Sequence, residues 1–175
     1  MVAMEAQTIR RTSQAVIDMM LSKTIIDKSH RVLEPSAGIG VLADGIARAC
    51  PEVGITCVEL NQNGVDALRE KGYDTVHSNF FHYLPDHSYD RIIASPTFKD
   101  NVDCNHVRHM YQLLSSGGEI VSLMSPAWMT GDTQVQAEFR QWLQERRYSI
   151  TMLPDNSFME GGKTVPTIII HIQKP

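Results

Sequence analysis

The segment from Val32 to Ala43 is the feature that most constrains the fold of this chain. Its sequence, VLEPSAGIGVLA, starts as a short apolar strand, continues through a turn with two glycines, Gly38 and Gly40, and ends as the start of a helix. Glycines let the backbone bend sharply and approach a ligand closely, and such a turn leaves N–H groups exposed at a helix N-terminus. The segment therefore predicts a buried parallel strand with a binding site for a nucleotide-like ligand at its carboxyl end, although a purely structural turn has the same pattern.

A second predicted strand, residues 55–59, ends in Glu59. This acid follows the glycines by about twenty residues, the distance at which a carboxylate can accept hydrogen bonds from two ribose hydroxyls. The pattern of Gly38, Gly40 and Ala43 alone fits a nicotinamide dinucleotide as well as S-adenosylmethionine. Glu34 and Pro35 before the glycines, and the block from Ser95 to Phe98, favour S-adenosylmethionine.

The order of the predicted elements indicates an α/β protein. Strands alternate with amphipathic helices until the last two strands, which have only a turn around Asn156 between them and can pair antiparallel. This pattern predicts a Rossmann-like, mostly parallel sheet of seven strands, with helices on both faces and an antiparallel hairpin at the C-terminus. The expected helices are 13–22, 41–49, one ending near 71, 103–114 and 133–146, and the expected strands are 31–34, 55–59, 74–77, 89–95, 119–124, 148–153 and 167–172.

Length and composition limit the possible functions. The 175 residues suit one domain, residues 1–175, without a separate target-recognition domain. No apolar run approaches a membrane span, and the first residues do not resemble a signal peptide, so we expect a cytoplasmic protein that does not contact membranes. A net charge of −4 argues against broad attraction to nucleic acid, so any such binding must use a local basic rim.

The cysteines and histidines do not predict a metal site. The three cysteines lack a C-x-x-C spacing, which indicates reduced thiols. Cys104, His106 and His109 share one predicted helix, but a solvated helix face explains them better than a metal site.

The block Ser95-Pro96-Thr97-Phe98 follows the predicted strand that ends near residue 94. Open α/β sheets bind ligands at the carboxyl edge, where this block would lie beside the glycine turn. Methyl transfer to an exocyclic amine of a base requires groups that draw the nitrogen lone pair out of the ring. The Ser95 hydroxyl and the Pro96 carbonyl can accept the amine protons while the Phe98 ring stacks on the base. The alternative is a simple turn at the end of a strand.

The whole chain resembles class I S-adenosylmethionine-dependent methyltransferases, and more narrowly the amino-methyltransferases that modify adenine or cytosine in DNA. The shared features are the glycine motif, Glu59, the block from Ser95 to Phe98, and Phe158 with Gly161-Gly162, in the same order. An N-terminal helix like theirs is also predicted, with Thr12-Ser13 where the family often has a Thr-Pro contact to the cofactor.

The resemblance implies the roles of individual residues. Glu34, Ser36, Gly38 and Gly40 would surround the methionine part of the cofactor, Glu59 would bind its ribose, and Asn79 with Phe80 would contact its adenine. The implied catalytic residues are Ser95, Pro96 and Phe98, and the implied cofactor-binding residues are Thr12, Glu34, Ser36, Ala37, Gly38, Gly40, Glu59, Leu60, Asn79, Phe80 and Ser95.

The chain departs from the family pattern at two places. Asn79 stands where the family usually has Asp, and an amide can still accept a bond from an adenine amino group. Thr97 stands where the family has the second proline of Asn-Pro-Pro or Ser-Pro-Pro, so the Pro96 carbonyl is aimed less firmly. Ser95 is also a weaker acceptor than the amide oxygen of the adenine enzymes.

The expected function is S-adenosylmethionine-dependent methylation of an exocyclic amino group of a nucleic-acid base, with adenine N6 ahead of cytosine N4 and DNA ahead of RNA. The alternatives are a methyltransferase for a protein side-chain amide, a catalytically impaired cofactor-binding module that serves a partner, and a nicotinamide-binding protein. A protein partner or a homodimer fits these readings. The candidates for substrate contact are residues 99–103, Trp128, Arg10, Arg11, Arg146 and Arg147.

Overall fold

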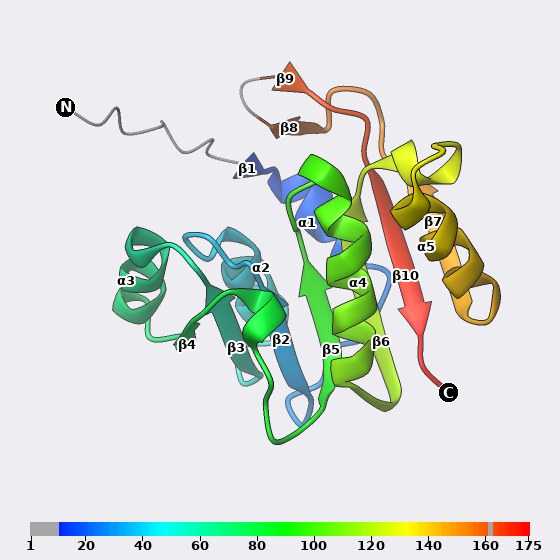
Figure 1. Ribbon diagram of the computed structural model, residues 1–175. Coiled ribbons are helices and arrows are strands. Elements are labelled where there is room, and N and C mark those ends of the chain that lie inside the picture. Colours follow the sequence, from blue (N-terminus) through cyan, green and yellow to red (C-terminus); the bar gives the residue numbers. More distant parts are fainter. Residues whose placement is uncertain (1–10, 161–162) are drawn as a thin grey trace.

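The computed structural model describes residues 11–160 and 163–175 and confirms the predicted α/β sheet (Figure 1). Seven strands form the main sheet in the order β4-β3-β2-β5-β6-β10-β7. The first five are parallel, and β10 lies antiparallel between β6 and β7. The strands are β2 (Arg31–Pro35), β3 (Gly54–Glu59), β4 (Asp74–His77), β5 (Tyr89–Ala94), β6 (Leu114–Met124), β7 (Arg147–Met152) and β10 (Ile168–Gln173).

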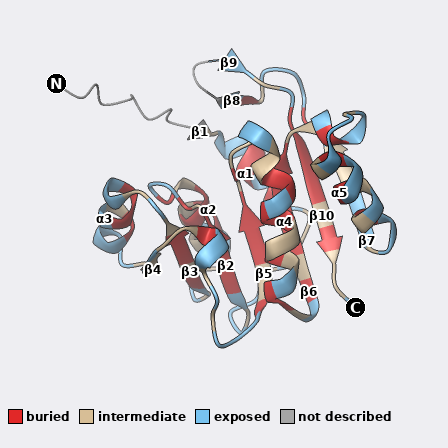
Figure 2. Cartoon of the chain, viewed as in Figure 1, coloured by how far each residue is buried: buried red, intermediate tan, exposed pale blue. Residues whose placement is uncertain are grey.

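Helices cover both faces of this sheet, because side chains alternate between two cores along each strand (Figure 2). Val32 of β2, for example, packs with α1, α2 and α3, whereas Leu33 packs with α4 and α5. Within the described ranges the helices are α1 (Gln14–Leu21), α2 (Val41–Ala49), α3 (Gln62–Glu70), η1 (Phe80–His82), η2 (Lys99–Asn101), α4 (Val102–Leu113), η3 (Pro126–Met129) and α5 (Gln134–Gln144), of which η1, η2 and η3 are short 3-10 helices.

The side chains before several helices explain where they begin. Ser13 accepts a hydrogen bond from the Val16 amide, and Asn61 accepts one from the Asn63 amide at 2.9 Å. Thr133 and Gln136 form a reciprocal capping box at the start of α5. Ser13 and Thr133 stand where the sequence predicts that these two helices start.

A second, small sheet was not predicted. The strands β1 (Arg11–Thr12), β8 (Phe158–Glu160) and β9 (Lys163–Thr164) pair antiparallel in the order β1-β8-β9. The predicted turn around Asn156 is present, and the predicted antiparallel pairing of the last two strands, β7 and β10, is confirmed. The segment between them also contains β8 and β9, which the sequence did not indicate. In Figure 1 this sheet lies beyond the end of the main sheet at which β5 finishes.

Smaller findings concern element ends and the cysteines. Leu114, expected at the end of a helix, has an extended backbone and begins β6. Cys57 and Cys104 are buried free thiols, and Cys50 is a half-buried free thiol. Among the described residues, no group of three or more His, Cys, Asp or Glu side chains could hold a metal ion. No helix within the described ranges has both the length and the apolar character that crossing a membrane requires.

Candidate active site

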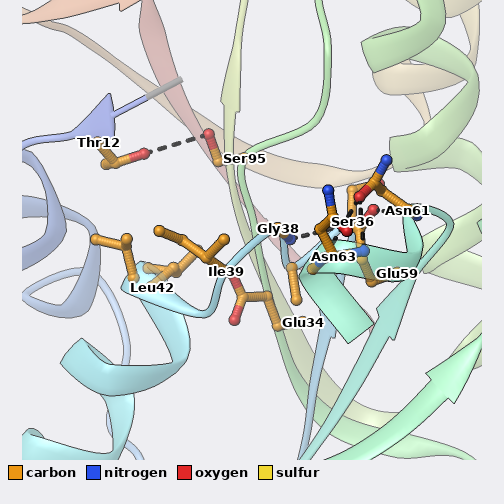
Figure 3. A pocket seen from close by; sticks show the side chains of 13 residues that line it. Thr12, Glu34, Ser36, Gly38, Ile39, Leu42, Glu59, Asn61, Asn63 and Ser95 are labelled. Atoms are coloured by element: carbon orange, nitrogen blue, oxygen red, sulfur yellow. Dashed lines mark hydrogen bonds between the residues drawn. The ribbon is translucent and has the colours of Figure 1, made fainter. Parts of the chain in front are cut away.

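A cleft of about 660 Å³ opens at the carboxyl ends of β2, β3 and β5. Its volume is within the range of small-molecule and cofactor sites. Figure 3 shows Thr12 and Ser95 at one end of the cleft and Glu59, Asn61 and Asn63 at the other. The cleft is lined by Thr12, Glu34, Ser36, Ala37, Gly38, Ile39, Val41, Leu42, Glu59, Asn61, Asn63, Gly64 and Ser95.

The glycine turn forms one wall of the cleft in an unusual backbone conformation. Ser36, Gly38 and Gly40 all have positive φ, at 65°, 57° and 84°. Glycine reaches such angles without the strain that a side chain would add. The Ala37 amide donates to the Val58 carbonyl at 3.0 Å, which ties the turn to β3.

Glu59 joins the glycine turn to the next helix. Its Oε2 accepts a hydrogen bond from the Gly38 amide at 2.7 Å, and its Oε1 accepts one from the Asn61 amide at 2.7 Å. A carboxylate has about four lone-pair sites, so each oxygen keeps capacity for a ligand hydroxyl. The side chain is thus held at the cleft by two backbone bonds and can still accept ribose hydroxyls.

Glu34 is a buried acid on the wall of the cleft. It is 3% exposed, and its Oε2 has no hydrogen-bond partner within the described part of the chain. Burial raises the pKa of Glu34 well above its usual value, and the charges of Asp44 and Glu59 raise it further. The Ala43 amide and the Lys71 ammonium oppose this shift. A buried carboxyl oxygen without a partner is costly unless a ligand supplies the missing donor.

The block after β5 lies at the other end of the cleft. The Thr12 hydroxyl donates to the Ser95 hydroxyl over 3.5 Å, the outer limit of a hydrogen bond. Pro96 is buried, and the half-buried Phe98 ring packs against Phe158 of β8 with a centroid separation of 5.4 Å. The small sheet therefore contacts this block at two residues, Thr12 of β1 and Phe158 of β8.

Not all predicted site residues reach the cleft. The predicted residues that line it are Thr12, Glu34, Ser36, Ala37, Gly38, Glu59 and Ser95. The predicted residues outside this lining are Gly40, Leu60, Asn79, Phe80, Pro96 and Phe98. Gly40 lies behind the turn against Leu68, and Leu60 is 63% exposed outside the cleft.

The two residues expected at the cofactor adenine also lie away from the cleft walls. Phe80 is buried, with its ring edge-on to His106 and His109 at centroid distances of 5.1 and 4.8 Å. Asn79 caps η1, because its Oδ1 accepts a hydrogen bond from the Phe81 amide at 3.0 Å. This arrangement gives both side chains a local structural role.

The sequence did not single out six residues that line the cleft. Val41 and Leu42 belong to the first turn of α2, and their spacing looks like that of core residues. Ile39 is 54% exposed between the two glycines. The start of α3, directly after Glu59, supplies Asn61, Asn63 and Gly64. A helix that begins just after a strand ending in an acid is the sequence signal that could have predicted these three residues at the cleft.

Several residues predicted as substrate contacts make structural interactions. Trp128 is buried with its ring edge-on to Phe139, because η3 folds it into the core. The Arg146 guanidinium lies over the Trp142 ring at 4.0 Å. Within residues 99–103, Asp103 is buried and accepts a hydrogen bond from the Ser125 amide at 2.9 Å. Arg10 and the side chain of Arg11 lie outside the described residues.

The fold and cleft define an α/β protein of the nucleotide-cofactor type, with the glycine turn and the acid at the carboxyl edge of the sheet. The model of the family described as "Methyltransferase small domain" matches residues 6–150. The chain belongs to this family. It is a methyltransferase, and its cofactor is S-adenosylmethionine.

Solved structures with low sequence identity share the fold. A modification subunit assigned to a type I restriction enzyme of Vibrio vulnificus YJ016 has a TM-score of 0.75 at 12% identity, over 98% of this chain but only 46% of the other. Precorrin-6y C5,15-methyltransferase of Geobacter metallireducens GS-15 has a TM-score of 0.68 at 17% identity, over 94% of this chain and 90% of the other. The plantazolicin methyltransferase BpumL, solved with SAH (S-adenosylhomocysteine), has a TM-score of 0.61 at 12% identity, over 93% and 81%.

The residues present fit this cofactor. Glu34 Oε2 is an orphaned buried acceptor on the cleft wall, and the α-ammonium group of S-adenosylmethionine is a donor of the right charge. Glu59 keeps acceptor capacity for two hydroxyls. Bound S-adenosylmethionine supplies an electrophilic methyl group on a sulfonium.

Proposed function

We propose that the protein methylates an exocyclic amino group of a nucleic-acid base, with adenine N6 ahead of cytosine N4. One observation carries the proposal: Ser95, the first residue of the Ser-Pro-Thr-Phe block, lines the same cleft as Glu34 and Glu59. An acceptor amine bound at Ser95 would therefore meet the cofactor end of one continuous site. In this proposal Thr12, Glu34, Ser36, Ala37, Gly38 and Glu59 bind the cofactor.

Methylation of such an amine requires a nitrogen lone pair that can attack the methyl group. In adenine and cytosine this pair is delocalised into the ring, so the amine is a poor nucleophile until its protons are held out of the ring plane. Ser95 Oγ and the Pro96 carbonyl are the two acceptors for these protons, and the Phe98 ring is the stacking surface for the base. The contact between Phe98 and Phe158 fixes the plane of that surface.

The relatives give partial support to this acceptor. The Vibrio vulnificus structure is described as a modification subunit assigned to a type I restriction enzyme, and this chain spans about half of it. The Geobacter metallireducens structure is described as a precorrin methyltransferase. The same fold thus serves several acceptors, and the block after β5 is what favours a base here.

A second candidate function is cofactor binding without transfer, in support of a partner. Thr97 favours it, because this residue lacks the fixed φ of the family's second proline. Its hydroxyl accepts a hydrogen bond from the Lys99 amide at 3.3 Å, a turn interaction that needs no substrate. This contact is consistent with a block that keeps its backbone conformation but does not catalyse methyl transfer.

The test is transfer of tritium from labelled S-adenosylmethionine to DNA, RNA and protein offered separately. Label in single- or double-stranded nucleic acid supports the proposal. Label in protein alone supports the side-chain amide reaction, and cofactor binding without transfer supports the second candidate.

Variants at position 95 sharpen this test. Ser95→Ala should lower transfer by on the order of 10²-fold, the typical effect of removing one polar group that acts in the transition state. Ser95→Asn should raise adenine methylation, because an amide oxygen is the stronger acceptor. Ser88→Ala is the matched control, since Ser88 is exposed before β5. If Ser95→Asn gives no gain over wild type, the adenine assignment is wrong.

A further inference from the structure

Lys71 is the residue at the C-terminal end of α3 and is not among the residues that line the cleft. Its Nζ donates to the Ile39 carbonyl at 2.8 Å and contacts Asp44 Oδ2 at 2.6 Å. The Tyr73 hydroxyl donates to Asp44 Oδ1 at 2.9 Å and so fixes the same carboxylate. Lys71 thus contacts a carbonyl of the cofactor-binding turn and is itself held by Asp44, and none of the three side chains lines the cleft.

The turn needs such a restraint because its sequence makes it flexible. Gly38 and Gly40 flank Ile39, and glycine loses more conformational freedom on folding than any other residue. Glu59 holds the Gly38 amide from the cleft side. Lys71 donates a hydrogen bond to the Ile39 carbonyl, so two neighbouring residues of the turn are each held by a charged side chain, one negative and one positive.

Gly40 brings this cluster close to the turn. A methyl group at Gly40 would lie 3.6 Å from both Lys71 Nζ and the Tyr73 ring, and 2.8 Å from Leu68. The backbone of the turn therefore packs directly on α3 and the start of the segment that leads to β4. Lys71 contacts the Ile39 carbonyl directly, one residue from the Gly38 amide that Glu59 binds.

We propose that Lys71, fixed by Asp44, is a positioning residue that holds the glycine turn in its cofactor-binding conformation. It acts through the Ile39 carbonyl and touches no substrate or cofactor. This inference concerns the cofactor half of the site and does not depend on which acceptor is methylated. Preorganisation of this kind raises affinity by reducing the ordering that the ligand must impose.

Charge gives the proposal a second, independent readout. Glu34 lies in the field of Asp44 and Glu59, which favour its protonated form, and of Lys71, which favours its ionised form. Cys57 and Tyr73 also face this group, and burial raises the pKa of both, so they stay neutral near pH 7. Neutralising Lys71 should therefore move the ionisation of Glu34 to higher pH, and neutralising Asp44 should move it to lower pH.

The experiment is calorimetric titration of the full chain with SAH from pH 5.5 to 9. Lys71→Met should weaken binding about tenfold at pH 7.5, equivalent to about 1.4 kcal/mol. Lys28→Met is the matched control, because Lys28 forms an ion pair with Glu52 at 3.4 Å that is far more exposed than the Lys71–Asp44 pair. Neither Lys28 nor Glu52 lines the cleft. It should bind SAH within about twofold of wild type, as expected for an exposed pair.

The pH profiles separate a positioning role from a loss of stability. Affinity should rise with pH as Glu34 ionises, and the midpoint should move up in Lys71→Met and down in Asp44→Asn, although both variants loosen the turn. Equal affinities of Lys71→Met and Lys28→Met for SAH would overturn the inference. So would pH midpoints that move in the same direction in Lys71→Met and Asp44→Asn. If Lys71→Met does not fold by circular dichroism, Asp44→Asn with its expected downward shift decides the question. Failure of the wild type to bind SAH would instead contradict the cofactor assignment.

Discussion

Replacing Glu34 by glutamine should move the affinity for the cofactor and the stability of the protein in opposite directions. The substitution keeps the size of the side chain and removes its charge. Glu34 is 3% exposed, lacks a partner for Oε2 among the described residues, and lines the cleft. Hydrogen bonds to charged groups contribute about 1.5–3 kcal/mol. Loss of such a bond to the cofactor ammonium should weaken binding about 10- to 150-fold.

The effect on stability follows from the raised pKa of Glu34. Burial holds the pKa of Glu34 in the folded protein well above the usual 4.5. As the pH rises, Glu34 therefore loses its proton in the unfolded chain before it does so in the folded protein. The free energy of unfolding of the wild type therefore falls by about 1.4 kcal/mol per pH unit between these two pKa values. Glu34→Gln has no such loss, and its stability relative to wild type should increase from pH 5 to pH 8.

Two assays check both signs. Urea unfolding at several pH values gives the stability of the two proteins, and calorimetric titration with SAH gives the affinity. Glu59→Gln serves as a comparison, because Glu59 is half-buried and already accepts two backbone bonds. A Glu34→Gln variant that binds SAH like wild type, or that becomes relatively less stable as the pH rises, would refute the reasoning.

Two further predictions concern packing and buried charge. Gly64→Ala should weaken SAH binding at least tenfold despite the better helix propensity of alanine, because the new methyl group would lie 2.7 Å from the Gly38 carbonyl oxygen. The control is Gly54→Ala, where a methyl group meets nothing within 4 Å. Equal SAH titration curves for the two variants would contradict the prediction. Burial raises the pKa of Asp103 from 3.8 to about 6, so between pH 4 and pH 7 the wild type should lose about 2 kcal/mol of stability relative to Asp103→Asn. An equal difference in the free energy of unfolding between the two proteins at both pH values would contradict this prediction.

The main sheet could be predicted because its signals are local and repeated. Apolar runs of strand length alternate with amphipathic helices, and hydrogen-bonding residues such as Ser13, Asn61 and Thr133 stand where helices begin. The glycine turn and Glu59 follow two adjacent strands, so their meeting at one edge follows from parallel pairing. The same logic places Ser95 after β5, next to β2 in the sheet.

The small sheet and the cluster at Lys71 could not be predicted in this way. The strands β1, β8 and β9 contain only two or three residues each, too few to show an alternating pattern. Lys71 and Asp44 are 27 residues apart, and their contact depends on how α3 packs against α2. Polar residues on solvated helix ends look alike in a sequence, whether or not they contact another element.

The two aromatic residues that the sequence placed at the site, Phe80 and Trp128, do not line the cleft, for a related reason. Phe80 and Trp128 both follow strands at the carboxyl edge, a position typical of ligand contacts. Short 3-10 helices, η1 and η3, turn their rings into the core, where Phe80 meets His106 and His109 and Trp128 meets Phe139. Burial of large aromatic side chains is strongly favourable, and the sequence does not show which way such a short helix turns.

The most direct measurement is a calorimetric titration of the wild-type protein with SAH and, separately, with NAD. The account predicts one-to-one binding of SAH in the cleft between the glycine turn and Ser95, loss of affinity in Glu34→Gln, and no heat from NAD. Absence of SAH binding at about 1 mM ligand, or tighter binding of NAD than of SAH, would contradict it.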